Sequence, residues 1–129
     1  MAYGTANVDV IQSSTAGTPP QFNDGNGTQV GTLCRAWVNY KGTATRAINA
    51  SFNVSSVTFS STGIYIVNFT TAFPDANYCM AGSASYVGGS GQPSLGLNNT
   101  GQTTTSATIS NVYATTNYDS PYVCAAFFR

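Results

Sequence analysis

The sequence predicts an all-β fold, an antiparallel β-sandwich with a jelly-roll-like arrangement of about seven to eight short strands. Val, Ile, Thr, Tyr and Phe dominate its apolar stretches, and no helical stripe of apolar residues is longer than one turn. Clusters of Gly, Pro, Asn, Asp and Ser separate these stretches. A small closed β-barrel is the alternative, because a similar number of short strands can build either architecture.

The first strand is expected at residues 8–14, where Val8 and Val10 alternate with other residues. It should end at Thr18-Pro19-Pro20, because proline lacks the N–H group that a strand ladder needs. The following Asn23-Asp24-Gly25-Asn26-Gly27 contains residues that tolerate positive φ. A short hairpin is therefore expected there.

The next strands are expected at 33–40, followed by a turn at Lys41-Gly42, and at 48–59. Along 48–59 the apolar positions shift parity by one between Val54 and Val57. Successive side chains of a strand point to opposite faces, so one extra residue has to be absorbed. This predicts a β-bulge at Ser55-Ser56.

Further strands are expected at 64–71, 78–86, 94–97, 103–113 and 122–128. Two of them, 64–71 and 122–128, are apolar on both faces, whereas a half-solvated strand would alternate with polar residues. A two-sheet sandwich covers only its inner faces. The second apolar face therefore predicts a subunit interface.

Three phrases follow one another in a fixed order: AWVNY at 36–40, SFNVSSVT at 51–58 and YIVNFTTAFPDANY at 65–78. This order resembles the distal domain of phage and prophage tail fibres, where the phrases read AWVNF with NGT, SFNVSSIT and VNFTTAMPDANY. The departures from that pattern are Tyr40, Lys41 and Phe73.

The resemblance implies the C-terminal receptor-binding tip of a homotrimeric fibre, in which each chain has two identical partners and no catalytic activity. It implies an extracellular location, on a virion tail fibre or on a bacterial surface or secreted fibre. Residues 1–7 are interpreted as an expression start or a remnant of the fibre shaft. Residues 8–129 are interpreted as a single fibre-tip domain.

The chain carries very little charge. Charged residues make up 6% of it, against about 25% in typical soluble domains, and its net charge is zero. Binding to nucleic acid or insertion into a membrane is not expected, because there is no basic stripe and no apolar stretch of about 20 residues. No cofactor or metal is expected either, since the chain has no His and its three cysteines lack paired spacing. Those cysteines are expected to be buried free thiols.

Catalysis is disfavoured because the chain has neither His nor Glu. Its four acidic residues, Asp9, Asp24, Asp75 and Asp119, lie in separate turn-like segments. A serine triad would lack its base, and a glycosidase would need two facing carboxylates.

A glycan or other envelope receptor would be bound by flat aromatic faces and neutral hydrogen-bonding groups, which this chain has in quantity. The ligand-binding candidates lie in or beside predicted loops: Tyr86, Gln92, Asn117, Tyr118, Asp119 and Tyr122. The alternative is a structural cap that registers three chains and binds no ligand.

An up-and-down connection of the predicted strands sorts the loops between two ends. The loops at 15–27, 60–63, 87–92 and 115–121 are then expected at the tip. Those at 41–45, 72–77 and 98–102 are expected at the shaft side.

Overall fold

The computed structural model describes residues 4, 7–15, 20–86, 88 and 91–129. Their contacts divide the chain into two compact units, Met1–Leu33 and Cys34–Arg129. The division therefore falls at Leu33, later than the expected boundary after residue 7. Of residues 1–7, only 4 and 7 lie within the described ranges.

The first unit contains the expected hairpin. Strand β1 (Phe22–Asn23) pairs antiparallel with β2 (Gln29–Gly31). The Asp24 carboxylate accepts hydrogen bonds from the backbone N–H groups of Asn26 and Thr28, each at 2.9 Å. This capping of the turn by an acidic side chain explains why the polar run forms a hairpin.

The strand expected at 8–14 is not formed, so that prediction is wrong. Its apolar side chains are exposed, with Val10 at 75%. A single alternating segment gains strand structure only when a neighbour pairs with its backbone, and residues 8–14 belong to none of the recorded ladders. The proposed stop at Thr18-Pro19-Pro20 lies outside the described residues except for Pro20.

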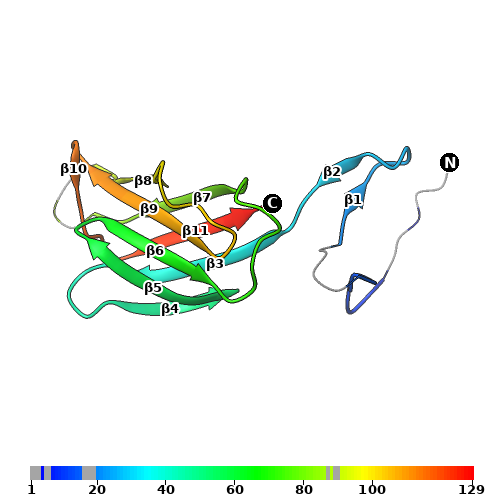
Figure 1. Ribbon diagram of the computed structural model, residues 1–129, viewed down its shortest axis with the longest axis horizontal. Coiled ribbons are helices and arrows are strands. Elements are labelled where there is room, and N and C mark those ends of the chain that lie inside the picture. The colour runs from blue at the N-terminus through cyan, green and yellow to red at the C-terminus, as the bar shows by residue number, and fades with distance from the viewer. Residues whose placement is uncertain (1–3, 5–6, 16–19, 87, 89–90) are drawn as a thin grey trace. The chain divides into compact units, whose positions relative to one another are not determined.

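The second unit is an antiparallel β-sandwich (Figure 1). One sheet has the order β4-β3-β11-β7 and consists of β3 (Cys34–Lys41), β4 (Ala47–Phe52), β7 (Cys79–Ala84) and β11 (Val123–Phe128). In the other sheet, β5 (Val54–Ser61), β6 (Ile64–Phe69) and β9 (Ser106–Tyr113) lie side by side, and β8 (Ser94–Leu97) and β10 (Thr116–Asn117) also pair with β9. No ladder joins the two sheets within the described residues, so the sandwich is not closed into a barrel.

The core consists of the inward residues of both sheets. Strand β6 contributes Tyr65, Val67 and Phe69, and the alternate positions between them are only half-buried. Around Phe69 the rings of Phe73, Tyr78 and Phe127 pack at centroid distances of 4.6, 5.7 and 5.1 Å. All the aromatic side chains of the phrase at 65–78 therefore belong to the core.

The stretch 48–59 is two strands in different sheets, not one, which corrects the prediction. The break is at Asn53, whose φ is 54°. Its side-chain amide donates to the carbonyls of Arg35 (3.0 Å) and Thr71 (3.1 Å), and its Oδ1 accepts the N–H of Thr71 at 2.7 Å. Asparagine tolerates positive φ better than most residues and here bonds to both neighbouring segments.

The expected bulge is confirmed. Val54 pairs with Phe69 and Ser56 with Asn68, so Ser55 is the extra residue between them. The parity shift in the sequence therefore has the predicted cause, but it occurs just after the chain has changed sheets.

Because residues 48–59 form two strands and not one, the loops before and after them are shared between the two ends of the sandwich differently from the prediction. The connections β3–β4, β5–β6, β7–β8 and β9–β11 lie at one end of the sandwich, which we call the loop end (Figure 1). Gly42 of the first connection donates its N–H to Ser120 of the last at 2.9 Å. Loop 41–45 therefore shares an end with 60–63 and 115–121, so the prediction that it lies at the opposite end from them is wrong. The loop at 15–27 belongs to the other unit.

The three cysteines are free thiols, but the expectation that they are buried is wrong. Cys79 is exposed, and Cys34 and Cys124 are half-buried. Cys79 and Cys34 lie on strands to either side of Phe128, at the outer end of β11. The apolar sequence around the cysteines does not reveal this exposure.

Candidate functional site: a tyrosine cluster at the loop end

Three tyrosine rings gather at the loop end. Tyr86 stacks on Tyr113 with ring centroids 4.1 Å apart and planes at 17°. Tyr118 lies tilted against both, at 5.3 Å from Tyr86 and 6.1 Å from Tyr113. We call Tyr86, Tyr113 and Tyr118 the tyrosine cluster.

A tight hairpin places two of the rings. Tyr113 ends β9 and pairs with Thr116 at the start of β10, so that the connection consists of Ala114 and Thr115. Both have positive φ, 46° and 72°, as a two-residue hairpin of this handedness requires. Tyr118 then follows β10 and donates its backbone N–H to Asn111 at 3.0 Å.

The glycine-rich segment approaches the cluster at Gly91. A side chain there would start 2.8 Å from the Tyr113 ring, and φ is 147°, which side chains rarely adopt. Only glycine fits this approach. Residues 87, 89 and 90 of the expected loop lie outside the described part of the chain, whereas the adjacent Gln92 is exposed.

Tyr122 is held beside the cluster by its backbone. Its carbonyl accepts the N–H of Ser85 at 2.9 Å, and its N–H donates to the Ser85 hydroxyl at 3.0 Å. Ser85 is the residue before Tyr86. The Tyr122 side chain itself is 62% exposed and is therefore free to meet a ligand.

Asp119 has a different position from the other predicted site residues. Its Oδ1 accepts the N–H of Gly63 at 2.7 Å and the Tyr65 hydroxyl at 2.5 Å, while Arg46 lies 3.3 Å from Oδ2. The side chain thus ties three connections of the loop end together. Its contacts fit a structural role, and its expected contact with a ligand remains a prediction.

The structure thus brings Tyr86 and Tyr118 together and puts Tyr122 next to them, as a loop-borne site requires. Asn117 is exposed in β10, directly before Tyr118. Sequence reasoning missed Tyr113, because it was counted as a residue of a strand. The signal that could have identified it is its position at the very end of that strand, directly before a hairpin.

Tyr86 and Tyr113 interact through their hydroxyl groups as well as through their stacked rings. The pKa of Tyr86 is raised, first by electrostatic repulsion from Tyr113 and then by a hydrogen bond with it. The phenol groups of the cluster offer hydrogen-bond donors and acceptors at the edges of the rings. Such a surface can stack on a flat partner and hydrogen-bond to its hydroxyl or amide groups.

Metal ligands do not gather in the described ranges: no three His, Cys, Asp or Glu side chains come together there. Nor do those ranges contain a helix long and apolar enough to cross a membrane.

Comparison with known proteins finds no match: no protein-family model, no curated protein and no solved structure is similar to this chain.

Proposed function

We propose that this chain is the receptor-binding tip of a trimeric, tail-fibre-like adhesin that attaches to a cell-surface glycan or another envelope receptor without catalysis. The observation that carries the proposal is the tyrosine cluster. It is a compact aromatic surface at one end of a rigid sandwich, flanked by exposed neutral groups of Gln92, Asn117 and Tyr122.

The chemistry of the cluster suits a saccharide. Tyrosine rings offer wide contact surfaces at little cost in rotamer entropy, and amide and hydroxyl groups match sugar hydroxyls. Loops on a rigid scaffold are also where binding residues are commonly found. The resemblance of three phrases to tail-fibre tips also supports the proposal. These phrases lie mainly in the scaffold strands, and the resemblance therefore concerns the scaffold and not the tyrosine cluster.

Assembly into a trimer is supported by the outer face of the β4-β3-β11-β7 sheet. The strand register places Phe52, Trp37, Ala126 and Ala81 in one row across the four strands. Phe52 is 55% and Trp37 40% exposed. An open groove of about 420 Å³ runs beside Trp37, lined mainly by small residues of β7 and β11. We call this row and groove the apolar outer face.

A second copy would cover the apolar outer face, since large aromatic side chains are depleted from solvent-exposed surfaces and enriched in interfaces. A trimer would also present three tyrosine clusters together. Linked binding sites gain avidity by about 10²–10⁴ when their spacing matches the target. Weak single contacts of neutral groups would then be sufficient for attachment.

The alternative function is a structural trimerisation cap with no ligand. The same apolar outer face favours it, because assembly alone would account for the exposed Trp37 and Phe52. The two functions differ in what they require of the tyrosine cluster, which a cap does not need.

A glycan array probed with the purified chain separates the two functions. The adhesin predicts reproducible binding to one class of surface glycan, lost in Tyr118→Ala and in Tyr86→Ala. The matched control is Asn99→Ala, an exposed polar residue in the β8–β9 connection at the opposite end of the sandwich. Each variant is also unfolded with denaturant, so that a loss of binding is not confused with a loss of fold.

Binding that survives Tyr118→Ala and Tyr86→Ala in folded protein would remove the tyrosine cluster from the proposal. A trimer that binds no glycan and no envelope preparation would favour the structural cap.

A further inference from the structure

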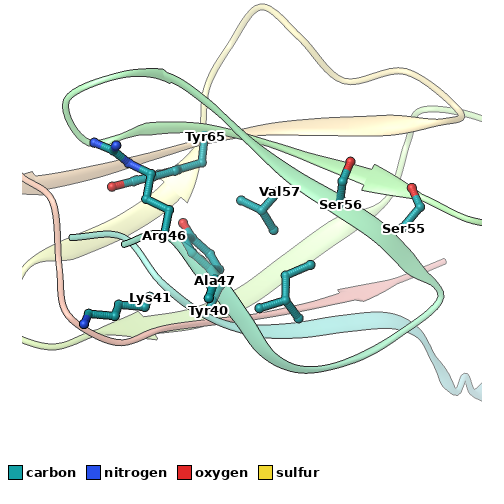
Figure 2. Close-up of a pocket in the computed structure, with 9 residues that line it drawn as sticks. Tyr40, Lys41, Arg46, Ala47, Ser55, Ser56, Val57 and Tyr65 are labelled. Atoms are coloured by element: carbon teal, nitrogen blue, oxygen red, sulfur yellow. The ribbon is translucent and has the colours of Figure 1, made fainter. Parts of the chain in front are cut away.

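The sandwich is closed along one side and open along the other. On the closed side β7 and β8 approach so tightly that a Cβ at Gly82 would lie 2.7 Å from the Leu95 side chain. On the open side β4 and β5, each the outermost strand of its sheet, leave a cavity of about 290 Å³ between them. Figure 2 shows Tyr40, Tyr65 and Val57, which come from both sheets, around this space.

Side chains that face inward on the open side are not covered. Ile48 pairs with Tyr40 in one sheet, and Phe59 pairs with Tyr65 in the other. Both tyrosines belong to the core, so Ile48 and Phe59 occupy inward positions of their strands. Ile48 is nevertheless 36% and Phe59 38% exposed, and Val57 on the same face of β5 is only half-buried. We call Ile48, Val57 and Phe59 the open seam.

The open seam presents an apolar surface. Arg46 lies with its guanidinium 3.6 Å from the centroid of the Phe59 ring, and Asp119 already pairs with it at 3.3 Å. Figure 2 shows the Lys41 side chain extending away from the cavity. A partner that covers the seam would therefore bury no unpaired charge there, which is the costly case.

A ring of three copies needs two different surfaces on each copy. In a cyclic trimer the interface is heterologous, so one surface of a subunit meets another surface of the next. The apolar outer face supplies only one of the two. If the second surface lay on the opposite side of the sandwich, head-to-tail contacts would extend into an open filament, whereas neighbouring sides allow the ring to close.

The open seam neighbours the apolar outer face. Strand β4 belongs to both, because its Phe52 pairs with Trp37 on the outer face and its Ile48 lies at the seam. In the described part of Cys34–Arg129, the exposed large apolar side chains fall in three places. These are the outer face (Trp37 and Phe52), the seam (Ile48 and Phe59) and the vicinity of the tyrosine cluster (Tyr122). The seam is thus the apolar surface left to receive the outer face of a neighbour.

We infer that the open seam of one subunit receives the apolar outer face of the next, with the partner subunit's Trp37 packed against Ile48 and Phe59. The inference rests on the proposed trimer and adds the surface that completes each of its interfaces. Burial of these side chains on assembly supplies the hydrophobic stabilisation that the separate chain lacks at its open side.

Chains altered on different surfaces test this pairing when they are mixed. Trp37→Asp alters the outer face, and Ile48→Asp alters the seam. Each chain alone should be a monomer of 13.4 kDa by sedimentation equilibrium, because assembly would bury the new carboxylate without a partner. An equal mixture should contain a dimer of twice that mass, since the intact seam of the first chain can still receive the intact outer face of the second.

The matched control is a mixture of Trp37→Asp and Phe52→Asp, which are both altered on the outer face and should stay monomeric. A second seam variant, Ser55→Arg, adds bulk and charge beside the cavity and removes one exposed hydrogen bond, to the carbonyl of Asn68. It should behave as Ile48→Asp does, alone and in the mixture with Trp37→Asp. Unfolding in urea verifies that every variant is folded.

The outcomes separate this inference from the adhesin proposal. A monomeric unaltered chain would remove the trimer itself, and the inference with it. A trimeric unaltered chain whose folded Ile48→Asp and Ser55→Arg variants are also trimers would show that the seam receives nothing, while the adhesin proposal would stand. The absence of a dimer from the Trp37→Asp and Ile48→Asp mixture, or its presence in the control mixture, would likewise contradict the pairing.

Discussion

The corner at Asn53 gives the sharpest test of how this sandwich is held together. Replacing Asn53 with alanine removes three side-chain hydrogen bonds, at 3.0, 3.1 and 2.7 Å, that join β3 and the segment after β6 to the β4–β5 corner. It also places a residue with a Cβ and no local polar group at a φ of 54°.

The expected loss follows from these contacts. Each hydrogen bond contributes about 0.5–1.5 kcal/mol net, and alanine at positive φ costs about 1 kcal/mol more than a residue that tolerates it. Because Asn53 is only half-buried, we take the lower part of the range and expect Asn53→Ala to lose about 2–3 kcal/mol of unfolding free energy. Asn53→Gly keeps the backbone geometry and should lose about 1–2 kcal/mol.

Unfolding in urea, followed by tryptophan fluorescence and circular dichroism, measures both variants against the unaltered chain. Asn99→Ala, at an exposed site, serves as control and should stay within about 0.5 kcal/mol. If Asn53→Ala also stays within that limit, the corner does not hold the two sheets as described. If glycine costs as much as alanine, the positive φ contributes nothing.

Three further outcomes are expected. Arg129 hydrogen-bonds to Asp75 and, together with the N–H of Asn77, lowers the pKa of Asp75 from 3.8 to about 2. The stability that this contact adds is full above pH 3.8 and is lost as the pH falls toward 2. The denaturant midpoint of unfolding should therefore vary less with pH in Asp75→Asn than in the unaltered chain. Burial raises the pKa of Tyr40 and Tyr65 above the ordinary value of 10.0; their stabilisation is present below pH 10 and declines above it, so ultraviolet titration should show both ionising only as the chain unfolds. Sedimentation equilibrium should give three times 13.4 kDa for the chain and 13.4 kDa for Trp37→Asp, because an interface would leave that carboxylate unpaired; a monomeric unaltered chain, or a trimeric Trp37→Asp, would refute the assignment of the apolar outer face.

The strands of the core could be predicted because the alternation of residues along them indicates which side chains are buried. On β6 the side chains alternate between buried and half-buried, and the half-buried Ile64 and Ile66 are those that suggested a second covered face. The bulge at Ser55 could also be predicted, since one extra residue moves every later side chain of the strand to the opposite face.

The corner at Asn53 could not be predicted from the sequence. A continuous alternation from Ile48 to Val54 looks the same whether the chain stays in one sheet or crosses to the other. The decision rests on hydrogen bonds from Asn53 to residues 18 positions away in either direction, which no local pattern contains. Missing this turn also put Gly42 at the wrong end.

The candidate sites were foreseen in part. Tyr86, Tyr118 and Tyr122 were chosen because they flank loops, and the fold brings them to one end. Tyr113 was hidden in its strand, and the cavity lined by Tyr40, Arg46 and Val57 was not predicted at all, since these residues come together only when β4 and β5 become sheet edges. Sites formed by unpaired edges depend on strand order, which local sequence does not determine.

The central claim, a trimeric tip that binds a surface receptor through its tyrosine cluster, is tested most directly by comparing the trimer with the Trp37→Asp monomer on one glycan surface. The account predicts that both bind the same glycan. The monomer, with its tyrosine cluster intact, should bind at least about 10²-fold more weakly, because it loses the linkage between three sites. Equal binding by monomer and trimer, or no binding by a well-folded trimer to any surface glycan, would contradict it.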